Sequence, residues 1–113
     1  MATSDRLAES VLELAGWTYK AKGMSVMPAR LANSIPAVLV RTLNQVEVAI
    51  NGDFEGALLA LKRVRGNAVG EVWVLSPLHS MGEAHSCLRG HVDRLVPWWI
   101  ENSVIKFGSP RIP

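Results

Sequence analysis

The sequence is divided by a sharp break at Asn51-Gly52-Asp53, which separates two apolar segments. Glycine readily adopts the left-handed conformation that ends a helix, and aspartate can cap the start of the next helix. The apolar residues on both sides recur at helical spacing: Ile35, Leu39, Leu43, Val46 and Ile50 before the break, and Phe54, Leu58, Leu59, Leu61 and Val64 after it. This spacing predicts an antiparallel helical hairpin over residues 36–65 with a minimal turn.

Two valines do not fit the helical spacing of the apolar residues before the break. Val40 and Val48 fall outside it, and Val48 helps to give residues 45–50 an alternating pattern that is typical of a strand. Helix and strand therefore both stay open for this segment. The Asn-Gly pair could also close a β-hairpin, but the residues after it have helical spacing.

Two further helices are expected, one near each end of the chain. The first begins after Thr3 or Ser4, either of which can cap it, and Gly23 is a natural stop. The second covers residues 80–96, and Pro97 ends or kinks it because proline removes a helical hydrogen bond.

Two short segments are strand candidates. Residues 71–75 are the best one, and residues 103–107 could pair with them. The expected fold class is mainly α, a compact single domain over residues 1–113 built around the hairpin and a long C-terminal helix. A minor two-stranded sheet would make it α+β instead. Residues 108–113 contain two prolines and a glycine and are expected to form a loose tail.

The composition favours self-association. Apolar residues make up 49% of the chain and charged residues only 19%, which is low for a soluble domain. A homodimer is the simplest way to cover the surplus apolar surface. No apolar run approaches the roughly 18 residues that a membrane span needs, and no signal peptide opens the chain. We therefore expect a cytoplasmic protein without a membrane partner.

A run of residues over positions 29–44 has a motif-like arrangement, carried by Ala29-Arg30-Leu31-Ala32, Ala37, Arg41, Leu43 and Asn44. It resembles the helix-turn-helix of lactose-repressor-type regulators, which implies DNA binding through residues 28–44. The reading face would carry Ala37, Val38 and Val40, where base-contacting polar side chains are needed. The net charge of +2 is also small for a nucleic-acid-binding protein. We expect no nucleic acid partner and keep a DNA-binding regulator as the third hypothesis.

All three histidines and the only cysteine lie between His79 and His91. Imidazole and thiol groups titrate or bind metal most readily near neutral pH. Glu83, Cys87 and His91 are spaced four and four, so on a helix they would form one ridge that could bind zinc. No Cys or His lies outside this segment to supply the fourth ligand, although an Asp or Glu could do so. We expect no metal and no cofactor. A small enzyme that uses residues 79–91 is the second hypothesis, without identified catalytic residues.

The four tryptophans suggest a binding surface, since indole combines a large apolar face with one donor. Adjacent side chains point in different directions, so Trp98 is expected in an interface while Trp99 faces elsewhere. Trp73, His85 and Trp99 are expected to line a pocket for a small apolar ligand beside the last helix. The leading hypothesis is a non-enzymatic binding module that acts as a homo-oligomer.

Overall fold

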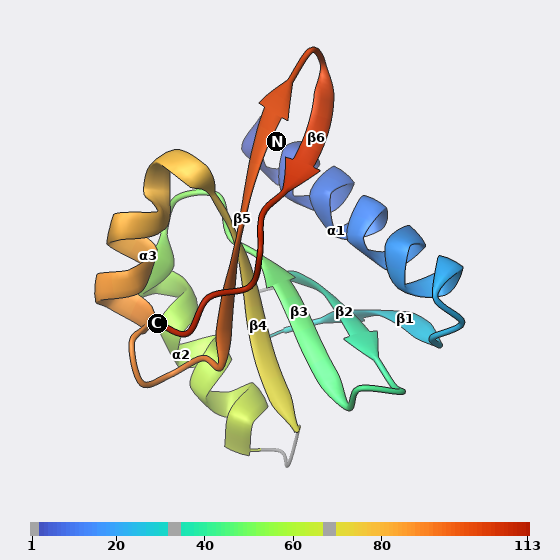
Figure 1. The fold of residues 1–113 in the computed structure, drawn as a ribbon. Helices are drawn as coiled ribbons and strands as arrows, with labels where there is room; N and C mark the ends of the chain where they lie inside the picture. Colours follow the sequence, from blue (N-terminus) through green and yellow to red (C-terminus); the bar gives the residue numbers. More distant parts are fainter. Residues whose placement is uncertain (1–2, 32–34, 67–69) are drawn as a thin grey trace.

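A computed structural model describes residues 3–31, 35–66 and 70–113 and shows a mixed α/β domain built on one six-stranded sheet (Figure 1). The strands lie side by side in chain order: β1 (Val26–Arg30), β2 (Pro36–Val40), β3 (Gln45–Ala49), β4 (Glu71–Pro77), β5 (Arg94–Glu101) and β6 (Val104–Phe107). The helices are α1 (Thr3–Ala21), α2 (Phe54–Gly66) and α3 (Met81–Leu88), with the short 3-10 turn η2 (Leu78–Ser80) before α3.

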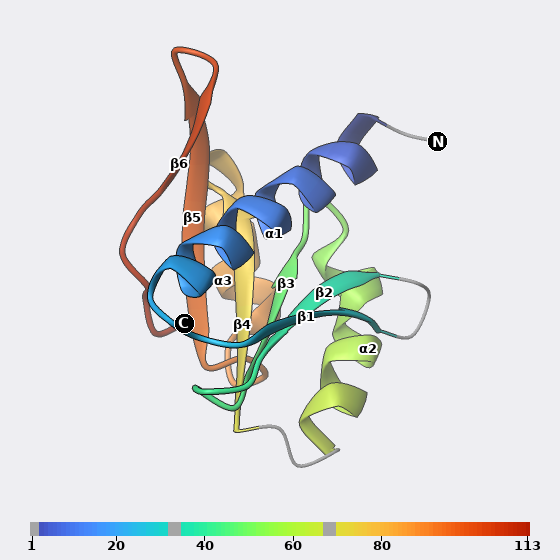
Figure 2. The same ribbon diagram turned by 90° about the vertical axis from the view of Figure 1, so that its right-hand side faces the viewer.

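The order of the strands determines which helices cover which face. Strands β1, β2 and β3 form an antiparallel meander, and β6 pairs antiparallel with β5. Strand β4 is parallel to β3 and β5 is parallel to β4, and these connections pass through α2 and α3. Crossover connections between parallel strands are right-handed. The two crossovers here proceed in the same direction across the sheet, so α2 and α3 lie on the same face. Helix α1 covers the opposite face (Figure 2).

Each face of the sheet therefore has its own core. The α2–α3 face buries Phe54, Leu61 and Leu88 against inward-facing valines of β3 and β4. The α1 face buries Val11 and Leu12 against β2, β3 and β5. The middle strands are covered on both sides, and apolar side chains are expected in such strands at nearly every position.

The predicted mainly α fold is wrong, and the helical hairpin over residues 36–65 does not form. Its second helix is confirmed as α2, but its first helix is replaced by strands. Residues 36–40 and 45–49 are strands β2 and β3, which confirms the strand alternative for the second segment. Val40 and Val48 are both 0% exposed, whereas Leu43 of the presumed helical stripe is 42% exposed. The helical spacing was accidental, because strands buried on both faces place apolar residues without alternation.

The predicted long C-terminal helix over residues 80–96 is also wrong. Helix α3 ends at Leu88, Gly90 has a φ of +82°, and β5 begins at Arg94. Pro97 fits within β5 because its carbonyl faces the C-terminal segment, where it accepts a hydrogen bond from the Gly108 amide at 2.8 Å. The missing N–H of proline therefore removes nothing from the pairing with β4.

Local signals in the sequence were more reliable. Helix α1 ends before Gly23, whose φ is +81°, as predicted. Asp53 caps α2, since its Oδ1 accepts a hydrogen bond from the Gly56 amide at 2.8 Å. Residues 71–75 lie in a strand as expected, but the second strand candidate pairs with β5 instead of β4. No helix-turn-helix forms in the described part of residues 28–44, which contains the end of β1 and all of β2.

The C-terminal part of the chain extends and then closes the sheet edge. The β5–β6 hairpin projects beyond the other strands (Figures 1 and 2). The segment predicted as a loose tail returns beside β5, and Arg111 and Leu95 exchange two backbone hydrogen bonds of 2.8 Å. Among the helices of the described residues, none has the length and apolar character to cross a bilayer.

Candidate functional site

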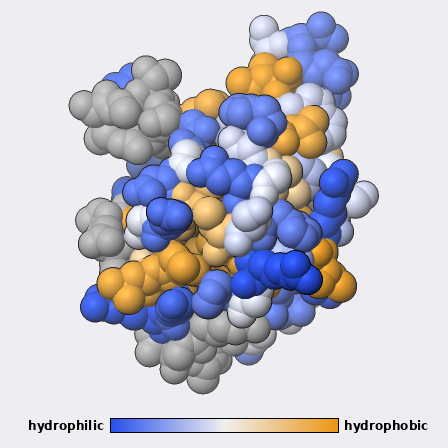
Figure 3. Space-filling model, turned by 90° about the vertical axis from the view of Figure 1, so that its left-hand side faces the viewer, coloured by the Kyte–Doolittle hydropathy of each residue, from blue (hydrophilic) through white to orange (hydrophobic). Residues whose placement is uncertain are grey.

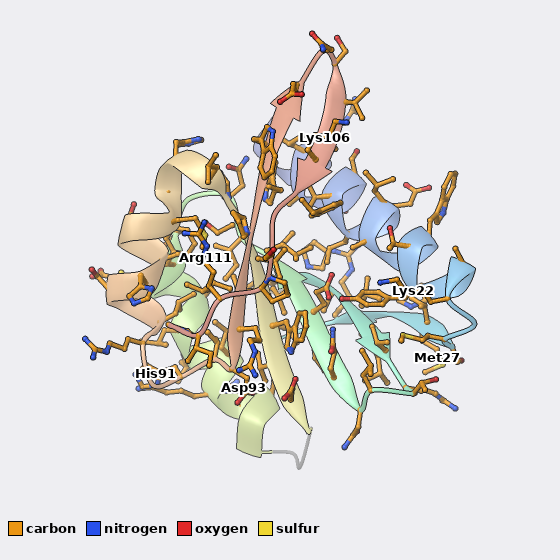
Figure 4. The ribbon with its side chains drawn as sticks, viewed as in Figure 1. Lys22, Met27, His91, Asp93, Lys106 and Arg111 are labelled. Carbon is orange, nitrogen blue, oxygen red and sulfur yellow. The ribbon has the colours of Figure 1, made fainter. Side chains whose placement is uncertain are left out.

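The histidine and cysteine segment does not assemble a site. His79 and His85 are exposed, and His91 lies beyond the end of α3, on the α3 side of the sheet, so the ridge of Glu83, Cys87 and His91 does not form (Figure 4). The pKa of the Cys87 thiol is raised by desolvation and by the carboxylates of Glu55 and Glu83, which disfavours a reactive thiolate. In the described part of the chain, no three His, Cys, Asp or Glu residues gather closely enough to hold a metal ion.

The three residues predicted to bind a ligand together are separated by the sheet. Trp73 lies on the α1 face, whereas His85 belongs to α3 on the opposite face. Trp99 lies on the projecting hairpin, where its Nε1 donates to Glu101 Oε1 at 3.4 Å. Of the three, only Trp73 lies at the site that is described next.

A polar cluster interrupts the core on the α1 face. In β3, Gln45, Glu47 and Ala49 alternate with Val46 and Val48, so they all face α1. Strand β3 lies between β2 and β4, which leaves Gln45 0% and Glu47 1% exposed. Acidic side chains are almost never so fully buried unless they are paired.

The hydrogen bonds of the cluster all involve neutral donors. The Tyr19 hydroxyl of α1 donates to Glu47 Oε2 at 2.5 Å, and Gln45 Nε2 donates to the same oxygen at 3.0 Å. Gln45 Nε2 also lies 3.2 Å from the Tyr19 hydroxyl. Gln45 Oε1 is enclosed and has no hydrogen-bond partner among the residues that the structure describes. Among the described residues, none donates to Glu47 Oε1 and no cationic side chain forms an ion pair with Glu47.

Burial changes the ionisation of both acidic groups. Desolvation raises the pKa of Glu47, and the hydrogen bonds from Tyr19 and Gln45 lower it only in part. Desolvation and the neighbouring Glu47 carboxylate raise the pKa of Tyr19, so the phenol stays protonated and remains a donor. The cluster is therefore a carboxyl group held in place by fixed neutral donors.

This carboxyl group lies at the edge of a cavity of about 320 Å³ between α1, the sheet and the C-terminal segment. The lining residues are mostly apolar and come from distant parts of the chain: Ala15, Thr18, Tyr19, Lys22, Met24, Leu43, Glu47, Trp73, Leu75, Val96, Phe107, Gly108 and Pro110. A volume of this size lies at the lower end of the range for small-molecule sites.

Trp73 and Lys22 complete the cavity. Strand register places Trp73 beside Glu47, and the Trp73 indole donates to Glu71 Oε1 at 2.7 Å, which fixes the orientation of the ring. Lys22 is exposed at the end of α1, on the α1 side of the sheet, and lies at the rim (Figure 4). The cavity thus combines aromatic walls, one buried carboxyl group and one solvated cation.

Sequence reasoning missed Tyr19, Gln45 and Glu47. A usable signal was present, because a single glutamate stands among the valines and alanine of residues 46–49. In the strand interpretation of that segment, the glutamate becomes a charged residue on a buried strand, which is a marker of function. In the helical interpretation, the same glutamate is an ordinary polar residue of an amphipathic helix and carries no such signal.

Comparisons with known protein families, with curated proteins and with solved structures found no match to this chain. The fold and the site alone therefore define the class: a mixed α/β domain with a buried carboxyl group beside an apolar cavity.

Proposed function

We propose that the protein is a non-enzymatic binding module that holds a small, largely apolar ligand in the cavity beside Glu47. The observation that carries this proposal is a carboxyl group that is 1% exposed, forms no ion pair with the described residues and borders a cavity of about 320 Å³. A buried titratable group whose pKa is shifted by desolvation, at the edge of a cavity, is a candidate for a functional residue. The apolar and aromatic walls would bind the body of the ligand, and Glu47 would orient its polar group.

Tryptophan fluorescence tests this site directly. We expect small aromatic compounds from a screen to quench the wild-type protein, and we expect the quenching to be lost in Trp73→Phe, because Trp73 borders the cavity. Trp17→Phe is the matched control, since Trp17 is 62% exposed and lies outside this cavity. Quenching that survives in Trp73→Phe but is lost in Trp17→Phe would contradict the proposal.

We also propose that the protein self-associates, because apolar residues are exposed on the β5–β6 hairpin and line a groove beside it. A groove of about 490 Å³ lies between α1, η2 and β5, and it is lined by Leu7, Asn51, Pro77, Leu78, His79, Trp98, Trp99 and Ile100. Ile100 and Val104 of the projecting hairpin are 55% and 51% exposed. On the α2–α3 side, hydrophobic residues form only small, separate patches (Figure 3). Two copies related by a two-fold axis could cover these hairpins mutually. Trp98, which was expected in an interface, is only 4% exposed and packs in the core of the α1 face beneath this groove.

Light scattering tests the dimer. The wild-type protein should show about twice the chain mass of 12.3 kDa at micromolar concentration. Ile100→Lys should shift it to the monomer, because a lysine ammonium at the centre of an apolar interface is unfavourable. Leu59→Lys, at a site on α2 that is 59% exposed, should leave the mass unchanged. A wild-type monomer, or a dimer that survives Ile100→Lys, would exclude this interface.

A further inference from the structure

We propose that the ligand of the Glu47 cavity is a cation, specifically an amine that carries an aromatic or similarly flat apolar ring. This inference rests on the proposed function and names the class of ligand. Three features of the cavity carry it: the missing counter-ion of Glu47, the free carboxylate oxygen and the aromatic walls.

The first feature is the missing counter-ion. A buried carboxylate is normally compensated by a paired cation. Within the described part of the chain, Glu47 forms no ion pair, and its only donors are the neutral Tyr19 hydroxyl and the Gln45 amide. A ligand with an ammonium group would supply the missing positive charge. A ligand carboxylate would instead place a second negative charge beside the first.

The second feature is the direction of the hydrogen bonds. Both donors contact Oε2 of Glu47, so Oε1 remains available to accept a hydrogen bond from a bound molecule. A hydrogen bond between an ammonium and a carboxylate is roughly twice as strong as one between neutral groups. The site therefore discriminates between a charged donor and a neutral donor of the same shape.

The third feature is the set of rings around the cavity. Trp73, Tyr19 and Phe107 line it together with Glu47. Aromatic faces attract both flat apolar groups and cations, and the attraction is strongest for indole. The hydrogen bond from Trp73 Nε1 to Glu71 holds the indole in a fixed orientation and brings another carboxylate to this part of the α1 face.

The other charged groups near the site do not remove this preference. Lys22 is exposed at the rim, and solvent screens its charge more strongly than it screens charges inside the cavity. Arg94 lies next to Trp73 in the strand register and keeps its charge, but its guanidinium donates to the Asp93 carbonyl at 2.7 Å and forms no ion pair with Glu47. Burial raises the pKa of Glu47, and a bound cation would favour the ionised form.

Calorimetric titration with three probes that share a phenyl ring tests the inference. The probes are 2-phenylethylamine, which is cationic near pH 8, the neutral 2-phenylethanol and the anionic phenylacetate. The amine should bind wild-type protein about tenfold more tightly than the alcohol, and phenylacetate should be weaker still. In Glu47→Gln the amine and the alcohol should bind within about twofold of each other. Glu101→Gln removes an exposed carboxylate from the hairpin and should keep the wild-type preference.

The outcomes separate this inference from the proposed function. Equal binding of amine and alcohol to the wild-type protein, or an amine preference that survives in Glu47→Gln, would overturn the cation inference and leave the cavity as a binding site. Absence of binding by all three probes at millimolar concentration would also overturn it. The proposed function would then depend on the Trp73 quenching screen alone.

Discussion

Replacement of Val48 by alanine should lower the free energy of unfolding by about 2–3 kcal/mol, whereas Leu43→Ala should change it by less than about 1 kcal/mol. Val48 is 0% exposed in the core between β3 and α2, so the lost methyl groups leave a cavity that the neighbours cannot fill. Leu43 lies in the turn between β2 and β3 and is 42% exposed. Truncation of a partly solvated side chain has a smaller effect on stability.

Urea unfolding followed by circular dichroism measures both effects, with the slope of the free energy against urea as the check that unfolding stays two-state. If residues 36–50 formed a helix, Leu43→Ala would lower the stability more than Val48→Ala. Leu43 would then belong to the buried stripe, and alanine at position 48 would be neutral or favourable because it has the highest helix propensity. A larger loss of stability in Leu43→Ala than in Val48→Ala would contradict the sheet.

The parts of the fold that were predicted correctly are those that local chemistry determines. Gly23 and Asp53 act within a few residues of their own positions, as a stop and a cap, and they marked the end of α1 and the start of α2. Residues 71–75 were a short apolar run between turn residues, which is typical of a buried strand. None of these assignments required knowing which distant segments pack against these residues.

The parts that were missed depend on pairing between distant segments. Strand β3 is buried on both faces only because β2, β4 and the helices cover it, so its residues lack the alternation of a half-buried strand. Pro97 indicated a helix end, but the returning segment at Gly108 makes it acceptable in β5. Prolines are tolerated in strands where no ladder donor is needed, and only the tertiary structure shows where that is.

The candidate site was missed for the same reason. Tyr19 and Glu47 are 28 residues apart, and they meet only when α1 lies across the sheet. Trp73 was predicted as a ligand-binding residue from its chemistry, and the structure places it at the cavity with a different set of neighbours. Its predicted partners His85 and Trp99 were chosen on a helix that ends at Leu88.

Replacement of Glu47 by glutamine should raise the free energy of unfolding by about 1–2 kcal/mol near pH 8. The amide oxygen can still accept the hydrogen bonds from Tyr19 and Gln45, and the variant buries no charge. The pKa of Glu47 is raised in the folded state, so the folded protein holds this proton to a higher pH than the unfolded chain. The wild-type protein is therefore expected to lose stability as the pH rises from the pKa of Glu47 in the unfolded chain to its higher pKa in the folded protein. Glu47→Gln has no carboxyl group at this position and does not show this loss.

Unfolding of the wild type and Glu47→Gln at about pH 4 and pH 8 tests the claim that Glu47 serves ligand binding although its burial lowers stability. Glu101→Gln serves as the control because its carboxylate is exposed, and it should match the wild type at both pH values. We expect Glu47→Gln to be more stable than the wild type near pH 8, and we expect the difference to shrink near pH 4. A variant that is less stable than the wild type near pH 8, by the same amount at both pH values, would show that the fold needs the carboxylate and would contradict the claim.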